Sequence, residues 1–254
     1  MKGKWRALAC AAVALAGSGC SPAPESRLET EALACLPEDT LAVAGVYPQR
    51  IRGRESNSLL PPAWSSALEP FRGATLVLLA YNGSDLLIVA SGRFAAPPPG
   101  AVLLTPELAL AGSPAAIRAA TAQHAARRTG AAELMAHAAP VVNKDIWAVM
   151  RGGIRLPLPG NGANVNRLLA LSEYTTASAV WDSAIRLEFD GHCTTPESAS
   201  RLEERLRALI TLGKTAVKRP DFASLFQSIE LMRDGAVVHL RFRASPQAVE
   251  ELLR

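Results

Sequence analysis

A hairpin signal in the first half of the chain constrains its fold most strongly. Two apolar runs, Thr75 to Tyr81 and Asp85 to Ala90, lie on either side of Asn82-Gly83. Asn-Gly readily adopts the positive φ values of a type I′ turn, whose twist suits two antiparallel strands. We therefore predict an antiparallel hairpin at this position.

Similar signals recur later in the chain. Further hairpins are predicted at Asp182-Ser183 and Asp234-Gly235. A side-chain cap followed by a proline, which has no N–H to leave unpaired, predicts that a helix begins. Such helix starts occur at Ser113-Pro114, Thr195-Pro196 and Ser245-Pro246.

The order of these elements predicts an α+β fold with two related modules. Each module reads β-α-β-β-(α)-β-β-α, with a largely antiparallel sheet packed by helices, because neither element buries its apolar face alone. We place the modules at 36–126 and 140–254, joined by a helical linker at 127–139. The alternative is one α+β domain whose pieces are similar by coincidence.

The first nineteen residues have the layout of a secretory signal peptide. Lys2, Lys4 and Arg6 precede an apolar stretch, Ala7 to Gly17, that is too short to cross a bilayer. Residues 1–19 are therefore set apart from the fold. The chain has 27 Lys and Arg against 23 Asp and Glu, and three of the basic residues lie in this leader. Without the leader, 24 basic residues stand against 23 acidic ones, and this near-neutral balance provides no positive electrostatic field that would attract nucleic acid.

The end of the leader resembles the lipobox of bacterial lipoprotein signals. Ser18, Gly19 and Cys20 match its last three positions, whereas Gly17 stands where the family usually has Leu, Val or Ile. The resemblance implies that Cys20 is lipidated, that 20–35 is a tether, and that the protein is membrane-anchored, facing the periplasm or the exterior. Cleavage after Ala16 is the alternative and would release a soluble secreted or periplasmic protein.

Two cysteines remain in the predicted body of the protein. An exported compartment permits a disulfide between Cys35 and Cys193. The alternative is two separately buried thiols. Sequence separation alone does not decide between them.

No pattern in the chain indicates catalysis, a metal or a cofactor. The sequence contains no G-x-S-x-G, H-E-x-x-H, C-x-x-C, Walker or G-x-G-x-x-G motif. Asp190, His192 and Cys193 are of the types that ligate zinc, but adjacent His-Cys residues point apart and no fourth ligand is evident. We predict that none of the three binds a metal and that the protein uses no cofactor.

Two loops form the one candidate binding region. They follow strands at equivalent places in the two predicted modules, and loops on a rigid scaffold often carry function. We expect them to form a shared rim. Its candidate residues are Arg50, Arg52, Arg54, Asn161 and Asn164.

The body is also similar to uncharacterised exported bacterial proteins built from tandem α+β modules. This likeness implies an architecture and no activity. We expect a lipid-anchored envelope protein that binds or scaffolds another envelope component, with the membrane and an envelope protein as partners and no nucleic acid. The alternative is an exported hydrolase whose active site is assembled only by the fold.

Overall fold

The computed structural model describes residues 24–52, 69–71, 73–128, 130–156, 162–181, 184–216 and 226–244. Its elements are α1 Pro24–Leu33, β1 Ala42–Val46, α2 Pro48–Arg52, the 3-10 helix η1 Glu69–Phe71, β2 Ala74–Tyr81, β3 Leu86–Gly92, β4 Ala101–Thr105, β5 Leu108–Gly112, α4 Pro114–Ala125, α5 Ala132–Ala138, β6 Ile146–Arg151, α6 Gly162–Leu169, β7 Tyr174–Trp181, β8 Ile185–His192, α7 Pro196–Ala216, β9 Glu230–Asp234 and β10 Val237–Ala244.

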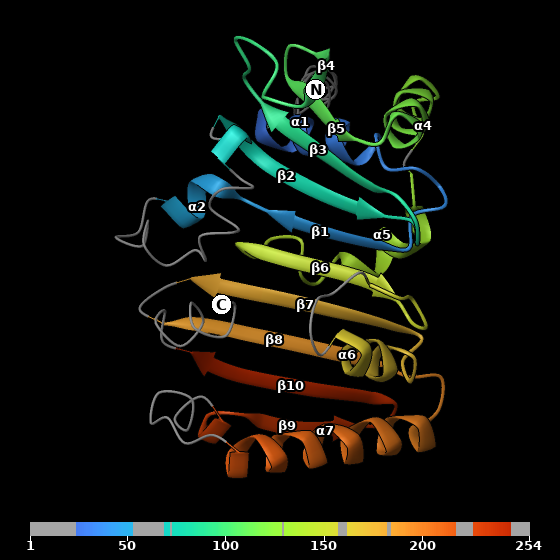
Figure 1. Cartoon of the computed structure of the whole chain (residues 1–254), viewed down its shortest axis with the longest axis vertical. Coiled ribbons are helices and arrows are strands. Elements are labelled where there is room, and N and C mark those ends of the chain that lie inside the picture. The colour runs from blue at the N-terminus through green and yellow to red at the C-terminus, as the bar shows by residue number, and fades with distance from the viewer. Residues whose placement is uncertain are drawn as a thin grey trace, which may run out of the picture.

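The described strands form one antiparallel sheet, and helices pack against it, which confirms the predicted α+β class. Its order is β4-β5-β3-β2-β1-β6-β7-β8-β10-β9 (Figure 1). The two halves meet at the antiparallel pair β1 and β6, in which Ala42 lies opposite Met150 and Val46 opposite Ile146. Counted outward from this pair, both halves place their strands in the same order. The two halves therefore contribute their strands to one continuous sheet and do not form two separate sheets.

The hairpin predicted at Asn82-Gly83 is confirmed, but its turn is not type I′. Tyr81 pairs with Leu86, so the loop has four residues, and only Gly83 has a positive φ, of 102°. The Asn82 side chain accepts hydrogen bonds from the backbone N–H groups of Ser84 and Asp85 at 3.1 and 2.8 Å. The Asn82 side chain thus pairs backbone N–H groups of the loop, as in an Asx turn, and Asn82 itself does not need a positive φ.

Local capping chemistry sets the starts of two helices as predicted. Ser113 accepts a hydrogen bond from the backbone N–H of Ala116 at 3.1 Å, and α4 begins at Pro114. Thr195 accepts one from the N–H of Ser198 at 3.2 Å, and α7 begins at Pro196. Hairpins β7–β8 and β9–β10 are also confirmed. The helix predicted at Ser245-Pro246 lies outside the described residues.

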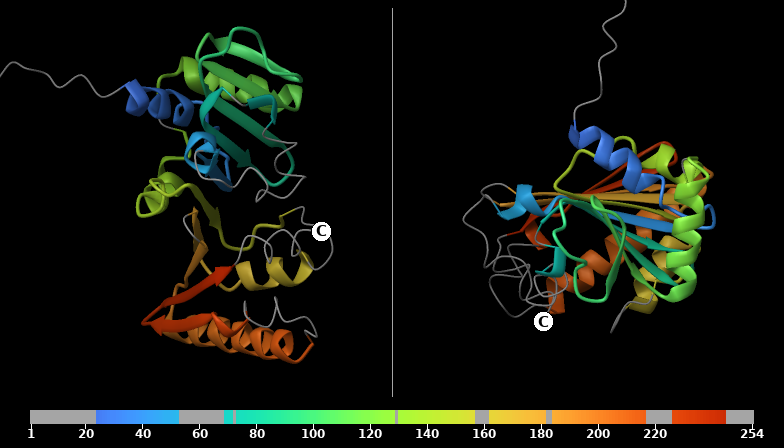
Figure 2. Two further views of the ribbon diagram at one scale, coloured as in Figure 1. Left: turned by 90° about the vertical axis from the view of Figure 1, so that its left-hand side faces the viewer. Right: turned by 90° about the horizontal axis from the view of Figure 1, so that it is seen from above.

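Helices cover opposite faces of the sheet in its two halves. Helices α1, α4 and α5 contribute to a core cluster with strands β1, β2, β3, β5 and β6. Helices α6 and α7 lie on the other face, against the strands of the second half (Figures 1 and 2). On the remaining face of the second half, helix α5 contacts β6 and β7.

A glycine and a tryptophan join the halves at the centre of the sheet. Gly45 of β1 lies opposite Trp147 of β6, and Trp147 is only 2 % exposed. A Cβ atom at Gly45 would lie 2.2 Å from the Trp147 ring, so only glycine admits the ring here. Trp147 thus belongs to the core cluster of the first half.

The prediction of a tether over 20–35 is wrong for its described part. Helix α1 begins at Pro24, and Ala32 and Cys35 are fully buried in the core cluster of the first half. Polar residues dominate this segment, but these few apolar side chains anchor it to the sheet. Within the described part of the chain, no helix has the length and hydropathy needed to span a membrane.

Candidate functional site

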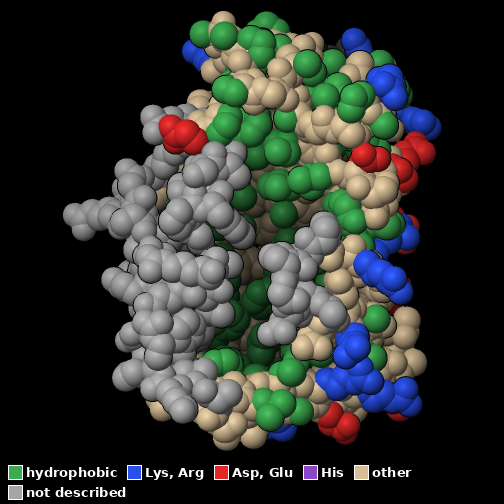
Figure 3. All heavy atoms as spheres, viewed as in Figure 1, with side chains coloured by type: hydrophobic (Ala, Val, Ile, Leu, Met, Phe, Trp, Pro, Cys, Tyr) green, Lys and Arg blue, Asp and Glu red, His purple; other side chains and the backbone are tan. Residues whose placement is uncertain are grey.

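A cavity whose described lining is mostly hydrophobic lies between α6, α7 and the sheet. Helix α6 is amphipathic, with Val165, Leu168 and Leu169 recurring at helical spacing on one side. That side faces the sheet, and Leu202 and Leu206 of α7 close the cavity from the next helix. Figure 3 shows hydrophobic side chains gathered in a hollow on this face of the molecule.

The cavity has a volume of about 300 Å³, and none of the described residues that line it is charged. This volume is at the lower end of the ~300–1,000 Å³ typical of small-molecule sites. Its walls are aliphatic and aromatic side chains with one glycine and two hydroxyls. They are Met150, Leu156, Val165, Leu168, Leu169, Ser172, Thr175, Phe189, Gly191, Leu202, Leu206, Val238 and Leu240. We call this cavity the apolar pocket.

The two hydroxyl groups in the apolar pocket are already hydrogen-bonded. Ser172 Oγ lies 2.9 Å from both the Leu169 carbonyl oxygen and Thr175 Oγ1. Because a buried hydroxyl that has its partners makes little demand on a ligand, the pocket selects for hydrocarbon and not for a polar group.

Gly191 allows α7 to approach the sheet at the pocket floor. A Cβ atom at Gly191 would lie 2.7 Å from Leu202 Cδ2. Leu202 packs in a cluster with Cys193, Ala199 and Val238. A larger residue at position 191 would therefore push α7 outward and change the pocket.

Polar and aromatic side chains occupy the opposite face of the same strands, since alternate residues point to opposite faces. The His137 ring of α5 stacks on Tyr174 with centroids 3.7 Å apart, and Tyr174 stacks on His192 at 4.2 Å. Next to this stack, His239 Nδ1 lies 2.6 Å from Asp190 Oδ1. Burial lowers the pKa of His192 below its usual value; His239 and His137 add to this effect, and Asp190 opposes it.

This polar face lacks the contacts that a hydrolase of the Ser-His type needs. Within the described residues, neither His192 nor His239 hydrogen-bonds a serine, threonine or cysteine. The described residues also contain no group of three or more His, Cys, Asp or Glu side chains placed to hold a metal. Asp190 pairs with His239, and Cys193 is buried on the opposite face of the sheet.

The cysteines of the body are two separately buried thiols. Cys35 and Cys193 are both free, and they belong to different core clusters in different halves. The disulfide alternative is therefore not formed. Burial, and to a lesser extent the Glu31 carboxylate, raises the pKa of Cys35 to about 12. Burial also raises the pKa of Cys193. Cys20 lies outside the described residues.

The structure places Arg50 and Asn164, two of the predicted rim residues, at opposite ends of the central strand pair. Arg50 follows the end of β1 at Val46, whereas Asn164 of α6 follows the end of β6 at Arg151. Because β1 and β6 are antiparallel neighbours, these two ends point in opposite directions. Arg50 instead stacks 3.8 Å above the Tyr47 ring and donates a hydrogen bond to the Asn143 carbonyl at 2.8 Å.

The other rim candidates add nothing to the site. Asn164 is exposed and does not line the apolar pocket. Arg52 is the last residue of α2. Arg54 and Asn161 lie outside the described residues.

Sequence reasoning missed the apolar pocket, although two of its signals are visible in the sequence. One is the spacing of Val165, Leu168 and Leu169 beside a polar helix face. The other is Gly191 inside a strand, which marks a close approach of another element. Neither signal reveals that the two segments meet.

Comparison with known proteins supports the fold alone. No protein-family model matches the chain, and no curated protein sequence matches it. Two solved structures are similar, crystal forms I and III of TP0453, with TM-scores of 0.51 and 0.54. Both are 7% identical in sequence, and the alignments cover 87% of this chain and 96% of that one.

Proposed function

We propose that this protein is an exported, lipid-anchored binding protein that holds the hydrocarbon part of a small ligand in the apolar pocket. One observation carries the proposal. The described residues that line the cavity of about 300 Å³ between α6, α7 and the sheet are mostly hydrophobic, and none of them is charged.

Burial of hydrocarbon supplies the driving force for such binding, at roughly 25 cal/mol per Å² of apolar surface removed from water. The hydroxyl groups of Ser172 and Thr175 already have hydrogen-bond partners within the protein, so they do not require a polar group of the ligand. A polar end of the ligand would remain in water at the mouth, where Val165 is 41% exposed. The ligand class is therefore an amphipathic molecule with a medium-length hydrocarbon chain.

A charge at the mouth tests this binding mode. We expect Val165→Asp to weaken the binding of a fluorescent fatty acid at least tenfold, because the carboxylate would lose hydration when the chain enters. Leu212→Asp is the matched control, since Leu212 is 63% exposed on α7 and does not line the pocket. Equal affinities in the two variants, or no saturable binding by the unchanged protein, would contradict the proposal.

An enzymatic function has less support than binding. None of the described residues that line the apolar pocket has a titratable side chain, whereas an active site needs groups that transfer protons or attack a substrate. The envelope protein partner expected from the sequence remains a prediction.

The location of the protein is a second part of the proposal. A lipid on Cys20 would hold the folded body at a membrane, and two or more acyl chains are needed for stable anchoring. We expect Cys20→Ala to move the protein from the membrane fraction to the soluble fraction. Mass spectrometry that finds an unlipidated N-terminus at Gly17 would instead support cleavage after Ala16.

We further propose that the two halves are related modules of one duplicated unit. The shared strand order, counted outward from β1 and β6, supports this origin. Superposition of 42–112 on 146–244 is expected to align the five strands of each half in the same order and direction. Alignment of fewer than three strands would contradict the duplication.

A further inference from the structure

The two flanks of helix α7 carry different charges. On one flank, Glu203 forms ion pairs with Arg207 at 2.6 Å and with Arg233 of β9 at 3.0 Å. This flank therefore faces the outer edge of the sheet, where β9 lies. Arg201 and Arg205 lie on the opposite flank, because each residue of a helix is turned by about 100° from the one before. That flank faces α6, and both of its arginines are exposed (Figure 1).

Arg205 lies beside the mouth of the apolar pocket. Its neighbour in sequence, Leu206, lines the pocket, and so does Leu202, which is one helical turn away. Leu168 of α6 packs with these leucines, so the pocket opens between the two helices. Figure 3 shows Lys and Arg side chains gathered to the right of the hydrophobic hollow, where Figure 1 places α6 and α7.

The positive charge of Arg205 is not compensated within the described part of the chain. Its guanidinium has no ion pair or hydrogen bond with any described residue. The residues one turn away along α7 are Arg201, Leu202, Ala208 and Leu209, and none of them is acidic. Arg201, four residues before it, is a like charge that repels it. On the α6 side, the whole segment 151–172 contains no Asp or Glu that would repel an anion.

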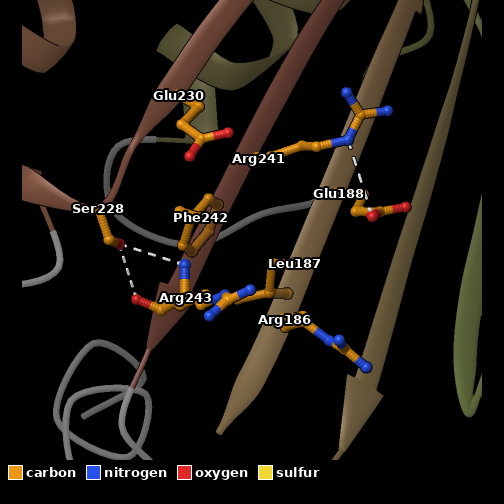
Figure 4. A pocket seen from close by; sticks show the side chains of 8 residues that line it. All are labelled: Arg186, Leu187, Glu188, Ser228, Glu230, Arg241, Phe242 and Arg243. Atoms are coloured by element: carbon orange, nitrogen blue, oxygen red, sulfur yellow. Dashed lines mark hydrogen bonds and ion pairs between the residues drawn. The ribbon is translucent and has the colours of Figure 1, made fainter.

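A second cavity in this half of the protein differs in its charges. It has a volume of about 390 Å³ and is lined by side chains of both signs (Figure 4). Within it, Arg241 Nε lies 3.7 Å from Glu188 Oε1, and Glu230 of β9 is opposite Arg241 in register. At the apolar pocket, by contrast, hydrocarbon walls adjoin a basic flank without an acidic residue within one turn of Arg205.

We propose that Arg205 binds the anionic head group of an amphiphile whose hydrocarbon chain fills the apolar pocket. The assignment rests on the function proposed above and narrows its ligand to an anionic amphiphile such as a fatty acid. Guanidinium presents parallel N–H donors that match the two oxygens of a carboxylate, and such charge-assisted bonds are stronger than neutral ones. A negative head group also relieves the repulsion between Arg201 and Arg205. Because it stays at the exposed mouth, the carboxylate keeps most of its hydration.

Calorimetric titration of the full chain with decanoate and with decanol tests the assignment, because the two ligands share a chain length and differ in charge. At low salt, we expect decanoate to bind about fivefold more tightly, as an exposed ion pair allows. High salt should reduce this difference by screening. Arg205→Gln should remove most of the difference and leave the affinity for decanol unchanged. The matched control is Arg207→Gln, which removes the same charge from the opposite flank of α7 and should bind decanoate as the unchanged protein does.

The two ligands separate a wrong head group from a wrong pocket. If decanol binds saturably and decanoate binds no more tightly, the assignment of Arg205 is overturned while the proposed function stands. Equal weakening of decanoate by Arg205→Gln and Arg207→Gln overturns it too. If neither ligand binds saturably, the proposed function fails, and the assignment fails with it.

A charge reversal gives a second test. In Arg205→Glu, decanoate should bind more weakly than decanol, because the head group would meet a carboxylate at the mouth. An unchanged affinity for decanol in the same variant shows that the pocket is intact. Decanoate that still binds more tightly than decanol would overturn the proposal.

Discussion

Truncation of Leu202 tests whether α7 is held to the sheet as the apolar pocket requires. Leu202 is 5% exposed and packs with Cys193, Ala199 and Val238 over Gly191. Truncation of a buried leucine to alanine costs about 2–5 kcal/mol, and the cost grows with the cavity that remains. Because Leu202 also lines an existing cavity, the neighbouring side chains have few atoms to fill the gap. We therefore expect Leu202→Ala to lower the free energy of unfolding by about 3 kcal/mol.

Thermal unfolding followed by circular dichroism measures this change. For a chain of this size, about 3 kcal/mol lowers the melting temperature by roughly 6–12 °C. Leu212→Ala is the control, since Leu212 is 63% exposed and such surface changes are usually within about 0.5 kcal/mol. A loss below about 1 kcal/mol for Leu202→Ala, or equal losses in the two variants, would refute the described packing of α7.

Two further predictions concern the buried thiols and the histidine stack. Cys35 and Cys193 should resist alkylation in the folded protein and give two free thiols after denaturation, because burial raises the pKa of each; rapid alkylation of both in the native state would contradict this. Because the folded protein lowers the pKa of His192, its neutral form contributes stability that is fully present above pH ~6.5 and is lost as the pH falls through the lowered pKa. His192→Gln should flatten that pH dependence in denaturant titrations, and an unchanged slope would argue against it.

The sequence predicted those elements whose chemistry is local. Asn82-Gly83, Ser113-Pro114 and Thr195-Pro196 act within a few residues, so the hairpin and the two helix starts follow from neighbouring atoms. The turn at Asn82 differs from the prediction because its side chain supplied hydrogen bonds in place of a backbone turn.

Features that depend on strand pairing were beyond local reasoning. The antiparallel contact of β1 with β6 joins residues about a hundred positions apart, and it separates Arg50 from Asn164, which were expected to lie on one rim. The apolar pocket combines α6, α7 and four strands, and none of these segments reveals its neighbours.

Intermolecular NOE spectroscopy with a ¹³C-labelled medium-chain fatty acid tests the central claim most directly. If the apolar pocket holds hydrocarbon, the methylene protons of the ligand will show NOEs to Leu168 and Leu206, and to the Phe189 ring beneath them. Exposed apolar side chains such as Leu86 and Val102, each 47% exposed in the first half, should show none. NOEs confined to those surface residues, or no NOEs at saturating ligand, would contradict the account.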